Sequence, residues 1–305
     1  MDFHQLEVFI SIAKHKSFSK AADSIFLTQP TLSAHIISLE NELGTMLFNR
    51  GSKEVSLTPS GKSFYGYALH LVNLRETAIA SLSSYMNKVE GRLELGVSTI
   101  PCDYILPSVI KVFNAEHANV VFSLHELTSV DVIQRVLDNE IEMGIVGMKP
   151  DQTKLEFVPL CDDRLVLITP NEGKFIQWSD QTVSIDAIKK ENFITRGKQS
   201  GTRKALEQAL KAKGLSLQDL NIVVESDSSE SIKQSVRYGL GIAIISARAV
   251  EDYQKFGVVR VFDVPELDFD SRFYLIHHKK RALSPLATYF KEFVVDYFSK
   301  VKDIN

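Results

Sequence analysis

A set of hydroxyl-bearing residues and glycines in this 305-residue chain has the types and spacing expected of an anion-binding site. Each of them follows an apolar, strand-like run or opens a helix-like run. In open α/β units, small ligands bind beyond the carboxyl ends of the strands, where unpaired N–H groups at helix starts and the helix dipole favour an anion. The sequence therefore predicts that these residues share a small-ligand site. The set is Ser98, Thr99, Thr128, Ser129, Gly147, Ser200, Gly201 and Thr202, together with Arg196.

Helix capping is the alternative explanation for each hydroxyl, because Ser and Thr begin helices in proteins of every function. The recurrence of such residues favours a shared site, to which Arg196 or Arg203 would bring positive charge. Cys102 lies four residues after Ser98, where its thiol either meets a reactive ligand or is an inert small group. The only other cysteine is Cys161, so neither a disulfide scaffold nor a CxxC zinc site is predicted.

A second polar set lies on one face of a helix predicted over residues 29–43. Thr28 is the expected N-cap, and Pro30 falls in the first turn, where its missing N–H costs nothing. One face of this helix is an apolar stripe that must pack, and the other carries short polar side chains suited to reading base edges in a major groove. The stripe is Leu32, Ile36, Leu39 and Leu43, and the polar face is Gln29, Thr31, Ser33, His35 and Ser38.

The elements that must position this face are two further helices and a β-ribbon. A short helix with Ser19 as its expected N-cap precedes the first one, and together they predict a helix-turn-helix, although many capped helical hairpins bind no DNA. Residues 2–14 are predicted to form the third helix of a small core, and Met46 to Thr58 a ribbon that would be a wing. The short helix is expected to contain Ala21, Ala22, Ile25 and Phe26, and the third helix Phe3, Leu6, Phe9, Ile10 and Ala13.

The sequence AAxxxxLTQPTLSxHIxxLExELGxxLFxR, followed by LTPSG, resembles the N-terminal domain of the LysR-type transcriptional regulators, without gaps from about residue 1 to 61. In that family the positions matching the start of the 29–43 helix meet DNA, and those matching Arg50, Gly51 and Lys53 lie in or beside the wing. The family often has Lys or Arg where this chain has Ile37, so one contact is expected to be absent. The predicted DNA-binding residues are Gln29, Pro30, Thr31, Ser33, His35, Ser38, Arg50 and Lys53.

From Ser60 onward, apolar residues recur at steps of four and three, apart from Arg75, which predicts a long helix packed against another helix. A surface helix lying on its own domain is the alternative. In the family the matching helix joins the domains and pairs with its twin, which implies a homodimer and favours a homotetramer. The predicted seam is Phe64, Ala68, Leu71, Ala78, Leu82, Tyr85 and Val89.

Beyond this helix, strand-like and helix-like runs alternate, which predicts largely parallel sheets in two subdomains. The resemblance implies two Rossmann-like lobes similar to periplasmic solute-binding proteins, with crossovers near Cys161 to Arg164 and Pro265 to Asp270. The expected strands are 93–97, 120–125, 143–146, 164–169, 193–195, 222–225, 241–245 and 273–277, and the main helices are 105–116, 130–139, 203–213 and 231–238.

The expected division is therefore a winged helix-turn-helix DNA-binding domain (1–60), a linker and dimerisation helix (61–90) and an α/β effector-binding domain (91–305). Its lobe I would hold residues 91–162 and 266–305, and its lobe II residues 163–265. The fragments STIPCDYILP and SGTRKALEQAL look most like the branch that includes regulators of sulfur and selenium assimilation. That resemblance implies a small oxyanion or a sulfur metabolite as the effector.

Composition and charge fit an ordinary soluble protein, with 44% hydrophobic and 24% charged residues and a formal net charge of −3. Residues 1–92 hold nine Lys or Arg against eight Asp or Glu. Phosphate neutralisation therefore contributes little, and useful DNA affinity is expected to depend on dimerisation. The chain has no apolar run of about 18 residues and no signal-peptide layout, so a cytoplasmic protein with no membrane partner is expected.

An enzyme is the main alternative, because two Rossmann-like lobes host many catalysts. The chain has no GxSxG elbow, no GxGxxG after a strand, no P-loop and no HExxH. Adjacent His277 and His278 on one strand point to opposite faces, which argues against a shared metal. The sequence predicts a DNA-binding transcriptional regulator that is controlled by a small molecule bound between the lobes, without a cofactor or metal, and with RNA polymerase as a partner if it activates. A small-anion-binding protein or an enzyme on the same fold stays the alternative.

Overall fold

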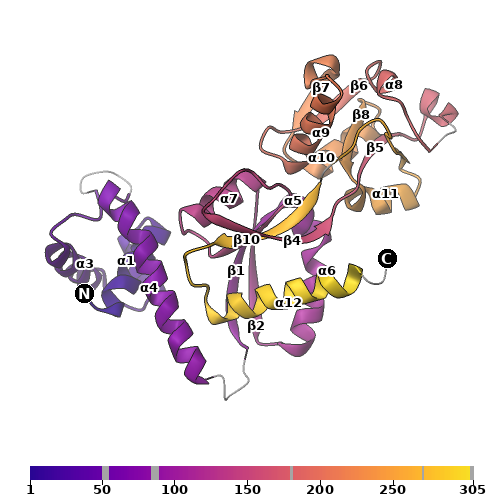
Figure 1. Ribbon diagram of the computed structural model, residues 1–305. Helices are drawn as coiled ribbons and strands as arrows, with labels where there is room; N and C mark the ends of the chain where they lie inside the picture. Colours follow the sequence, from indigo (N-terminus) through magenta and orange to yellow (C-terminus); the bar gives the residue numbers. More distant parts are fainter. Residues whose placement is uncertain (50–54, 84–88, 179–180, 270, 303–305) are drawn as a thin grey trace.

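The N-terminal part is a three-helix core joined to a long helix (Figure 1). The computed structural model describes residues 1–49, 55–83, 89–178, 181–269 and 271–302. Helix α1 spans Phe3–His15, α2 Phe18–Ser24 and α3 Gln29–Leu43. A capping box begins α1: the Asp2 carboxylate accepts from the Gln5 N–H at 2.7 Å, and the Gln5 side chain accepts from the Asp2 N–H at 2.9 Å.

The predicted start and end of the short helix α2 are both wrong. Ser17, not Ser19, caps it, because the Ser17 hydroxyl accepts the backbone N–H three residues later at 3.4 Å. Ser19 lies inside the helix and donates to Gln29 Oε1 at 3.2 Å, which links α2 to α3. The helix ends at Ser24, and Phe26 has φ 55° and is 96% exposed. A left-handed residue ends a helix regularly when it is Gly, so the phenylalanine gave no signal of that end.

Helix α3 begins and ends as predicted. The Thr28 hydroxyl accepts from the Thr31 N–H at 3.4 Å, Pro30 lies in the first turn, and Gly44 ends the helix at φ 66°. Of the apolar stripe, Leu32, Ile36 and Leu39 are buried. Leu43, the last predicted member of the stripe, is exposed, because it lies at the end of the helix and beyond the core.

The start of the predicted ribbon is held by a buried carboxylate. Glu40 Oε1 accepts from the N–H of Leu47 at 2.7 Å and of Phe48 at 3.2 Å, so the end of α3 fixes the chain that follows it. Phe48 then forms an antiparallel bridge with Leu57. The predicted residues Arg50 and Lys53 lie outside the described residues.

Helix α4, Pro59–Ser83, lies against α1 along its first half. Phe64, Ala68 and Leu71 of the predicted seam pack into the core of their own N-terminal unit, so this part of the seam is wrong as a surface for a second chain. Ala78 is exposed, the side chain of Leu82 and the whole of Tyr85 lie outside the described residues, and Val89 packs on the core of the following unit. In the described part of α4 the exposed large apolar side chains are Tyr67, Leu74 and Ile79.

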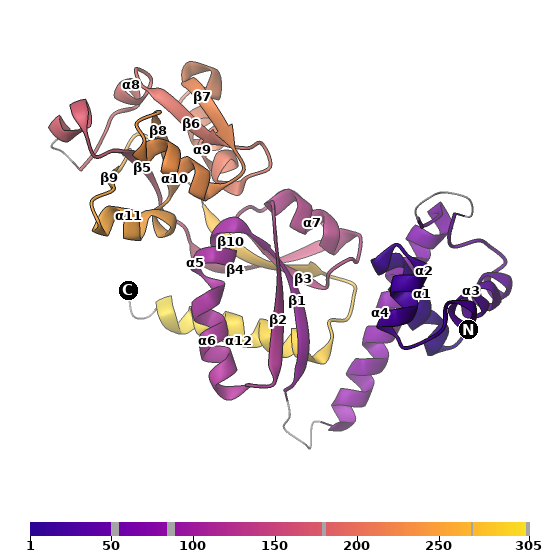
Figure 2. The ribbon, with the colours of Figure 1, turned by 180° about the vertical axis from the view of Figure 1, so that it is seen from behind.

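Two five-stranded sheets form the rest of the molecule (Figures 1 and 2). Lobe I has the order β2-β1-β3-β10-β4 and lobe II the order β7-β6-β8-β5-β9. The strands of lobe I are β1 Gly91–Ser98, β2 Val120–Leu127, β3 Met143–Val146, β4 Leu155–Asp162 and β10 Arg272–His278. Those of lobe II are β5 Leu165–Pro170, β6 Asn192–Arg196, β7 Asn221–Ser226, β8 Ile242–Ser246 and β9 Val259–Phe262.

Helices and short 3-10 turns cover both sheets. In lobe I they are α5 Thr99–Tyr104, α6 Leu106–Glu116, α7 Ser129–Leu137 and α12 Pro285–Lys302. In lobe II they are α8 Ile185–Ile188, α9 Gly201–Ala212, α10 Ser229–Arg237 and α11 Glu251–Lys255, with 3-10 turns at Gly173–Gln177, Leu217–Asp219 and Ala247–Val250. No helix was predicted at the position of α12, which buries Phe290 and Val294 in the core of lobe I.

The sheets are mixed and not largely parallel, which corrects the prediction. Strands β10 and β5 each run antiparallel to both neighbours, because the chain enters them after crossing from the other lobe. Strands β4 and β9 were not predicted. Both lie at sheet edges, and β4 contains Pro159, which an edge strand tolerates and which makes the sequence look unlike a strand.

Helix α4 also contacts lobe I. The N–H of Ala282 donates to His70 Nδ1 at 3.1 Å, and the Asn73 side chain donates to Glu142. A Cβ on Gly66 would lie 2.1 Å from the side-chain nitrogen of Asn139, so a larger residue there would have to displace the Asn139 amide. The N-terminal unit is thereby fixed against the sheet of lobe I.

Candidate ligand cleft and nucleic-acid interface

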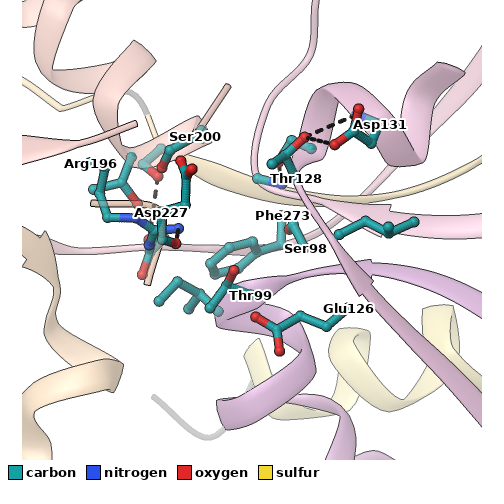
Figure 3. Close-up of a pocket in the computed structure, with 17 residues that line it drawn as sticks. Ser98, Thr99, Glu126, Thr128, Asp131, Arg196, Ser200, Asp227 and Phe273 are labelled. Atoms are coloured by element: carbon teal, nitrogen blue, oxygen red, sulfur yellow. Dashed lines mark hydrogen bonds between the residues drawn. The ribbon is translucent and has the colours of Figure 1, made fainter. Parts of the chain in front are cut away.

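A cavity of about 280 Å³ opens between the two lobes, and Figure 3 shows the side chains that line it. Every one of the nine predicted ligand-binding residues lines this cavity. These residues lie at the cavity because parallel strands of both sheets end beside it. Strand β1 ends at Ser98, β3 ends just before Gly147, and β6 ends at Arg196. The full lining is Ser98, Thr99, Ile100, Glu126, Leu127, Thr128, Ser129, Asp131, Gly147, Asp163, Arg196, Ser200, Gly201, Thr202, Asp227, Ser271 and Phe273.

The lobes touch at the edge of this cavity. A Cβ on Gly201, at the start of α9, would lie 2.4 Å from the carbonyl oxygen of Gly147 in lobe I. Across the same boundary, the Thr128 hydroxyl oxygen lies 3.2 Å from the Gln199 side-chain amide. The side chains of the two lobes therefore face one shared space.

Capping explains some of the cleft hydroxyls and not others. Thr128 is a true cap of α7, since its hydroxyl accepts from the Asp131 N–H at 3.1 Å. Ser98 and Ser200 occupy the cap positions of α5 and α9 but make no side-chain capping bond. Within the described chain, the buried hydroxyls of Ser98, Ser200 and Thr202 form no hydrogen bond to protein, so they are available to a ligand.

Arg196 is the buried cation of the cleft, with only 7% of its surface exposed. Its guanidinium donates to the Ser229 hydroxyl and, at 2.9 Å, to the carbonyl oxygen of Asp227. The Nε–H is buried without a partner, which is an uncommon and costly state for a charged group. Burial lowers the pKa of Arg196, and the neighbouring carboxylates of Asp227, Glu126 and Asp103 oppose this shift.

Arg203, the other predicted charge, does not line the cleft. Its guanidinium donates to Glu207 at 2.9 Å, to Glu225 at 2.6 Å and to the carbonyl oxygen of Arg196 at 3.0 Å. Arg203 therefore supports the strand end that carries Arg196.

The carboxylates of the cleft were missed by the sequence analysis. Asp131 lies two residues after the predicted site residue Ser129, so nearness in the chain was a usable signal there, whereas Asp227 follows β7 and is next to none of the predicted site residues. Asp163 and Ser271 lie at the two crossings between the lobes, and only the assembled sheets bring them together. Glu126 comes near the end of β2 and gave no local signal.

Asp163 ties the two crossings to each other. It is 5% exposed, and its carboxylate accepts from the hydroxyl of Ser246 at 2.6 Å and of Ser271 at 3.4 Å. Its N–H donates to the carbonyl oxygen of Ser271 at 2.9 Å. Burial raises the pKa of Asp163 to about 6, although both hydroxyls and Arg248 favour the ionised form.

Cys102 is not among the residues that line the cavity. Burial raises the pKa of its thiol to about 11, and the charges of Asp103 and Glu126 act in the same direction. A thiol with such a pKa is mostly protonated and a poor nucleophile. Neither Cys102 nor Cys161 forms a disulfide in the described part of the chain, and the residues that the structure describes include no group of three or more His, Cys, Asp or Glu that could hold a metal.

Helix α3 lies on the side of the N-terminal unit that is turned away from lobe I (Figures 1 and 2). Gln29, Pro30 and Thr31 are exposed at its start, and Ser33 is half-buried and bonded to no described side chain. The far end of the face is partly occupied: Ser38 Oγ accepts from the Gln5 side chain at 3.2 Å, and the ring of His35 packs on that of His4 at 4.9 Å. Ile37, where the family often has a cation, is exposed.

Comparison with known proteins assigns both parts of the chain. A family model described as "Bacterial regulatory helix-turn-helix protein, lysR family" matches residues 3–62, and one described as "LysR substrate binding domain" matches residues 87–299. An HTH-type transcriptional regulator of Methanocaldococcus jannaschii, MJ0300, is 32% identical over 289 residues, which is 94% of this chain and 96% of that protein. Across the described helices no segment is both long and apolar enough to cross a membrane.

Two solved structures share the fold. A full-length OxyR variant from Pseudomonas aeruginosa has a TM-score of 0.79 at 20% identity, covering 98% of this chain and 94% of that one. Full-length CbnR, solved as a complex with its target DNA, has a TM-score of 0.63 at 19% identity, covering 96% of this chain and 99% of that one.

Proposed function

Since this chain belongs to the LysR family of transcriptional regulators, we propose that the cleft between its lobes holds the small-molecule effector and that α3 enters the major groove of the operator. The family's members are DNA-binding transcriptional regulators and not enzymes, and this chain has both of the family's parts.

The observation that carries the effector site is that the buried cation Arg196, whose Nε–H has no partner, lines the same cavity as three hydroxyls that bond to no described group. A ligand with a carboxylate or an oxyanion would satisfy these donors together. The small oxyanion or sulfur metabolite that the branch resemblance implies offers such an acceptor. No cofactor is needed for this recognition.

Isothermal titration calorimetry on the full chain tests the site. The ligand is taken from a panel of sulfate, thiosulfate, selenite and small carboxylic and amino acids. Ser98→Ala should lower the affinity of whichever compound binds by roughly tenfold or more, because a hydrogen bond to a charged group is worth about 1.5 to 3 kcal/mol. Ser108→Ala, which removes a hydroxyl on α6 outside the cleft, is the matched control. If the parent and both variants bind the compound equally well, the ligand does not bind in this cleft.

For DNA, the residues proposed to contact the operator are those at the start of α3, namely Gln29, Pro30, Thr31 and Ser33, with Arg50 and Lys53 from the wing. His35 and Ser38 are proposed as secondary contacts, since both also pack on α1. The position of α3 on the outer side of the molecule supports this arrangement. The CbnR complex with its target DNA has the same fold.

The working unit is proposed to be a cytoplasmic homodimer formed through α4, with a homotetramer and contact with RNA polymerase in an activator. In this proposal residues 1–60 bind DNA, 61–90 join the chains, and 91–305 bind the effector, with lobe I formed by 91–162 and 266–305 and lobe II by 163–265. The exposed Tyr67 and Leu74 support it, because these large apolar side chains of α4 do not pack into the core that contains Phe64, Ala68 and Leu71. Leu74→Asp should halve the mass measured by sedimentation. An unchanged mass would show that this surface of α4 is not part of the dimer interface.

A further inference from the structure

The proposed effector cleft is lined by more negative than positive charge. Four carboxylates line it, those of Glu126, Asp131, Asp163 and Asp227, and Arg196 is the only cation among its described lining residues. A bare anion entering this space would meet the guanidinium and several like charges at once. The charge of the cleft therefore fits a pure oxyanion poorly.

Two of the four carboxylates already have partners. Asp131 Oδ2 accepts from the Thr128 hydroxyl at 2.7 Å, and Asp163 accepts from Ser246 and Ser271. Hydroxyl donors within the protein therefore already stabilise these two charges.

The other two carboxylates, those of Glu126 and Asp227, accept no hydrogen bond from any residue that the structure describes. Glu126 comes from β2 in lobe I, and Asp227 follows β7 in lobe II. Both are close enough to Arg196 to influence its pKa. In Figure 3 Asp227 lies beside Arg196, while Glu126 lies on the opposite side of the cavity, near Thr99. The two free carboxylates therefore face one space from different lobes.

Arg196 is a second observation, independent of the carboxylates, that points to a ligand in this cleft. It is more than nine-tenths buried, it lines the cavity, and its Nε–H has no acceptor. Arg196 therefore offers its charge to an acceptor group on a ligand, and the exposed carboxylates of Glu126 and Asp227 offer acceptors to a donor group. A metal ion would be an alternative source of positive charge, but the described residues contain no metal-binding group of carboxylates, cysteines or histidines.

We infer that the effector is a small amino-acid-like zwitterion, whose carboxylate accepts from Arg196 and the free cleft hydroxyls and whose ammonium group donates to Glu126 and Asp227. The cavity of about 280 Å³ is at the small end of ligand pockets, roughly 300–1,000 Å³, which favours a small amino acid or its short acyl derivative. Because the two carboxylates belong to different lobes, the ammonium group connects the lobes when it binds. This inference rests on the proposed effector site and names the chemical class of its ligand.

The test is calorimetry on the full chain with matched probes that differ in the ammonium group. The first set contains glycine, alanine, serine, cysteine, threonine, valine and O-acetyl-L-serine, the last at mildly acidic pH so that its acetyl group stays on oxygen. The second set contains glycolate, lactate, glycerate and N-acetyl-L-serine, which keep the carboxylate and lack the ammonium charge. Sulfate and thiosulfate form the third set.

At least one compound of the first set should bind, and glycolate, lactate, glycerate and N-acetyl-L-serine should each bind at least tenfold more weakly than it. Glu126→Gln and Asp227→Asn should each lower the affinity tenfold or more, since each replaces a charge-assisted hydrogen bond by a neutral one. The control is Asp186→Asn on α8, an exposed carboxylate outside the cleft, which should bind like the parent.

Two outcomes overturn the inference. In one, sulfate or thiosulfate binds more tightly than every amino acid and Glu126→Gln strengthens that binding; the effector site would then stand and the ligand class would be wrong. In the other, no member of the first set binds at millimolar concentration. Failure of the proposed site itself looks different: an amino acid binds the parent, and Ser98→Ala, Glu126→Gln and Asp227→Asn all bind it equally well.

Discussion

The outer face of α3 and the cleft between the lobes are both rich in short polar side chains, yet they are built in opposite ways. On α3 the polar groups are spread along one helix and are mostly exposed, as at Gln29 and Thr31. In the cleft they come from strand ends and helix starts of two lobes, and several are buried, as at Ser98 and Thr202. A convex exposed face suits a large partner such as a DNA groove, whereas a concave buried one can satisfy and desolvate a small ligand.

The two sites also differ in which parts of the structure must be held in place. The face of α3 needs one helix to be held at its two ends, by the Thr28 cap and by the bonds from Glu40 to the chain after it. The cleft needs two lobes to be held at a fixed distance, which is the role of Asp163 and Ser271 at the crossings. Mutations should therefore act locally in the first site and through the lobes in the second.

The largest effect is expected at Glu40. Glu40→Ala leaves the buried N–H groups of Leu47 and Phe48 without an acceptor, at roughly 1 to 3 kcal/mol each, so the N-terminal unit should lose roughly 2 to 6 kcal/mol of stability. Chemical denaturation followed by hydrogen exchange in residues 1–49 measures this loss. The cleft should keep its ligand affinity below the transition, and a loss of ligand binding in the folded variant would contradict the independence of the two sites.

Operator binding should respond next, at Ser33. Ser33→Glu adds a negative charge to the face that we propose meets DNA, so operator affinity should fall at least a hundredfold, about 3 kcal/mol, without loss of folding. Ser33→Ala is the control and should have a much smaller effect. Gel shifts measure operator affinity, and thermal melting shows whether the variant is folded. A folded Ser33→Glu protein with the operator affinity of the parent would show that α3 does not bind in the groove.

The comparison also explains how far the sequence could predict each region. On α3, the cap, the apolar stripe and the polar face are properties of one helix, so periodicity and cap chemistry are enough to identify them. In the cleft, Ser98, Arg196 and Thr202 were found because strand ends and helix starts are also local features. Glu126 and Asp163 were not, because their place depends on which strands pair and where the chain crosses between lobes.

The errors have the same cause. The helix α2 was placed two residues late because Ser17 and Ser19 both look like caps, and the core decides between them. The first part of the α4 seam was assigned to a partner chain because a heptad pattern does not say whether the packing surface belongs to the same chain. Strand directions were predicted as parallel because alternation along the chain does not reveal the two crossings at Asp163 and Ser271.

A smaller and pH-dependent effect is expected at Asp163. Its folded-state pKa of about 6 is above the ordinary value of 3.8, so the folded chain binds more protons than the unfolded chain between these values. The contribution of Asp163 to stability therefore falls as pH rises from about 4 to about 7, by about 2 kcal/mol, and is constant above that.

Asp163→Asn removes this dependence. The difference in unfolding free energy between the variant and the parent should shift by about 2 kcal/mol in favour of the variant between pH 4 and pH 7. Paired denaturation curves at the two pH values measure it. Glu116→Gln, at the end of α6 and away from the crossings, is the matched control and should show no such change. A difference that is the same at both pH values would mean that Asp163 is ionised throughout or does not hold the crossings.

The smallest expected effects separate the two kinds of hydroxyl within the cleft. Thr128→Ala removes the cap of α7 and should cost about 1 kcal/mol of stability. Thr202→Ala removes a hydroxyl that bonds to no described group, so stability should change by less than about 0.5 kcal/mol, while ligand affinity falls several-fold if this hydroxyl meets a charged ligand group. Melting curves with and without the bound compound measure both quantities in the same samples. If Thr202→Ala lowers stability as much as Thr128→Ala and leaves ligand affinity unchanged, the hydroxyl belongs to the framework of α9, and the distinction between caps and ligand donors fails at this position.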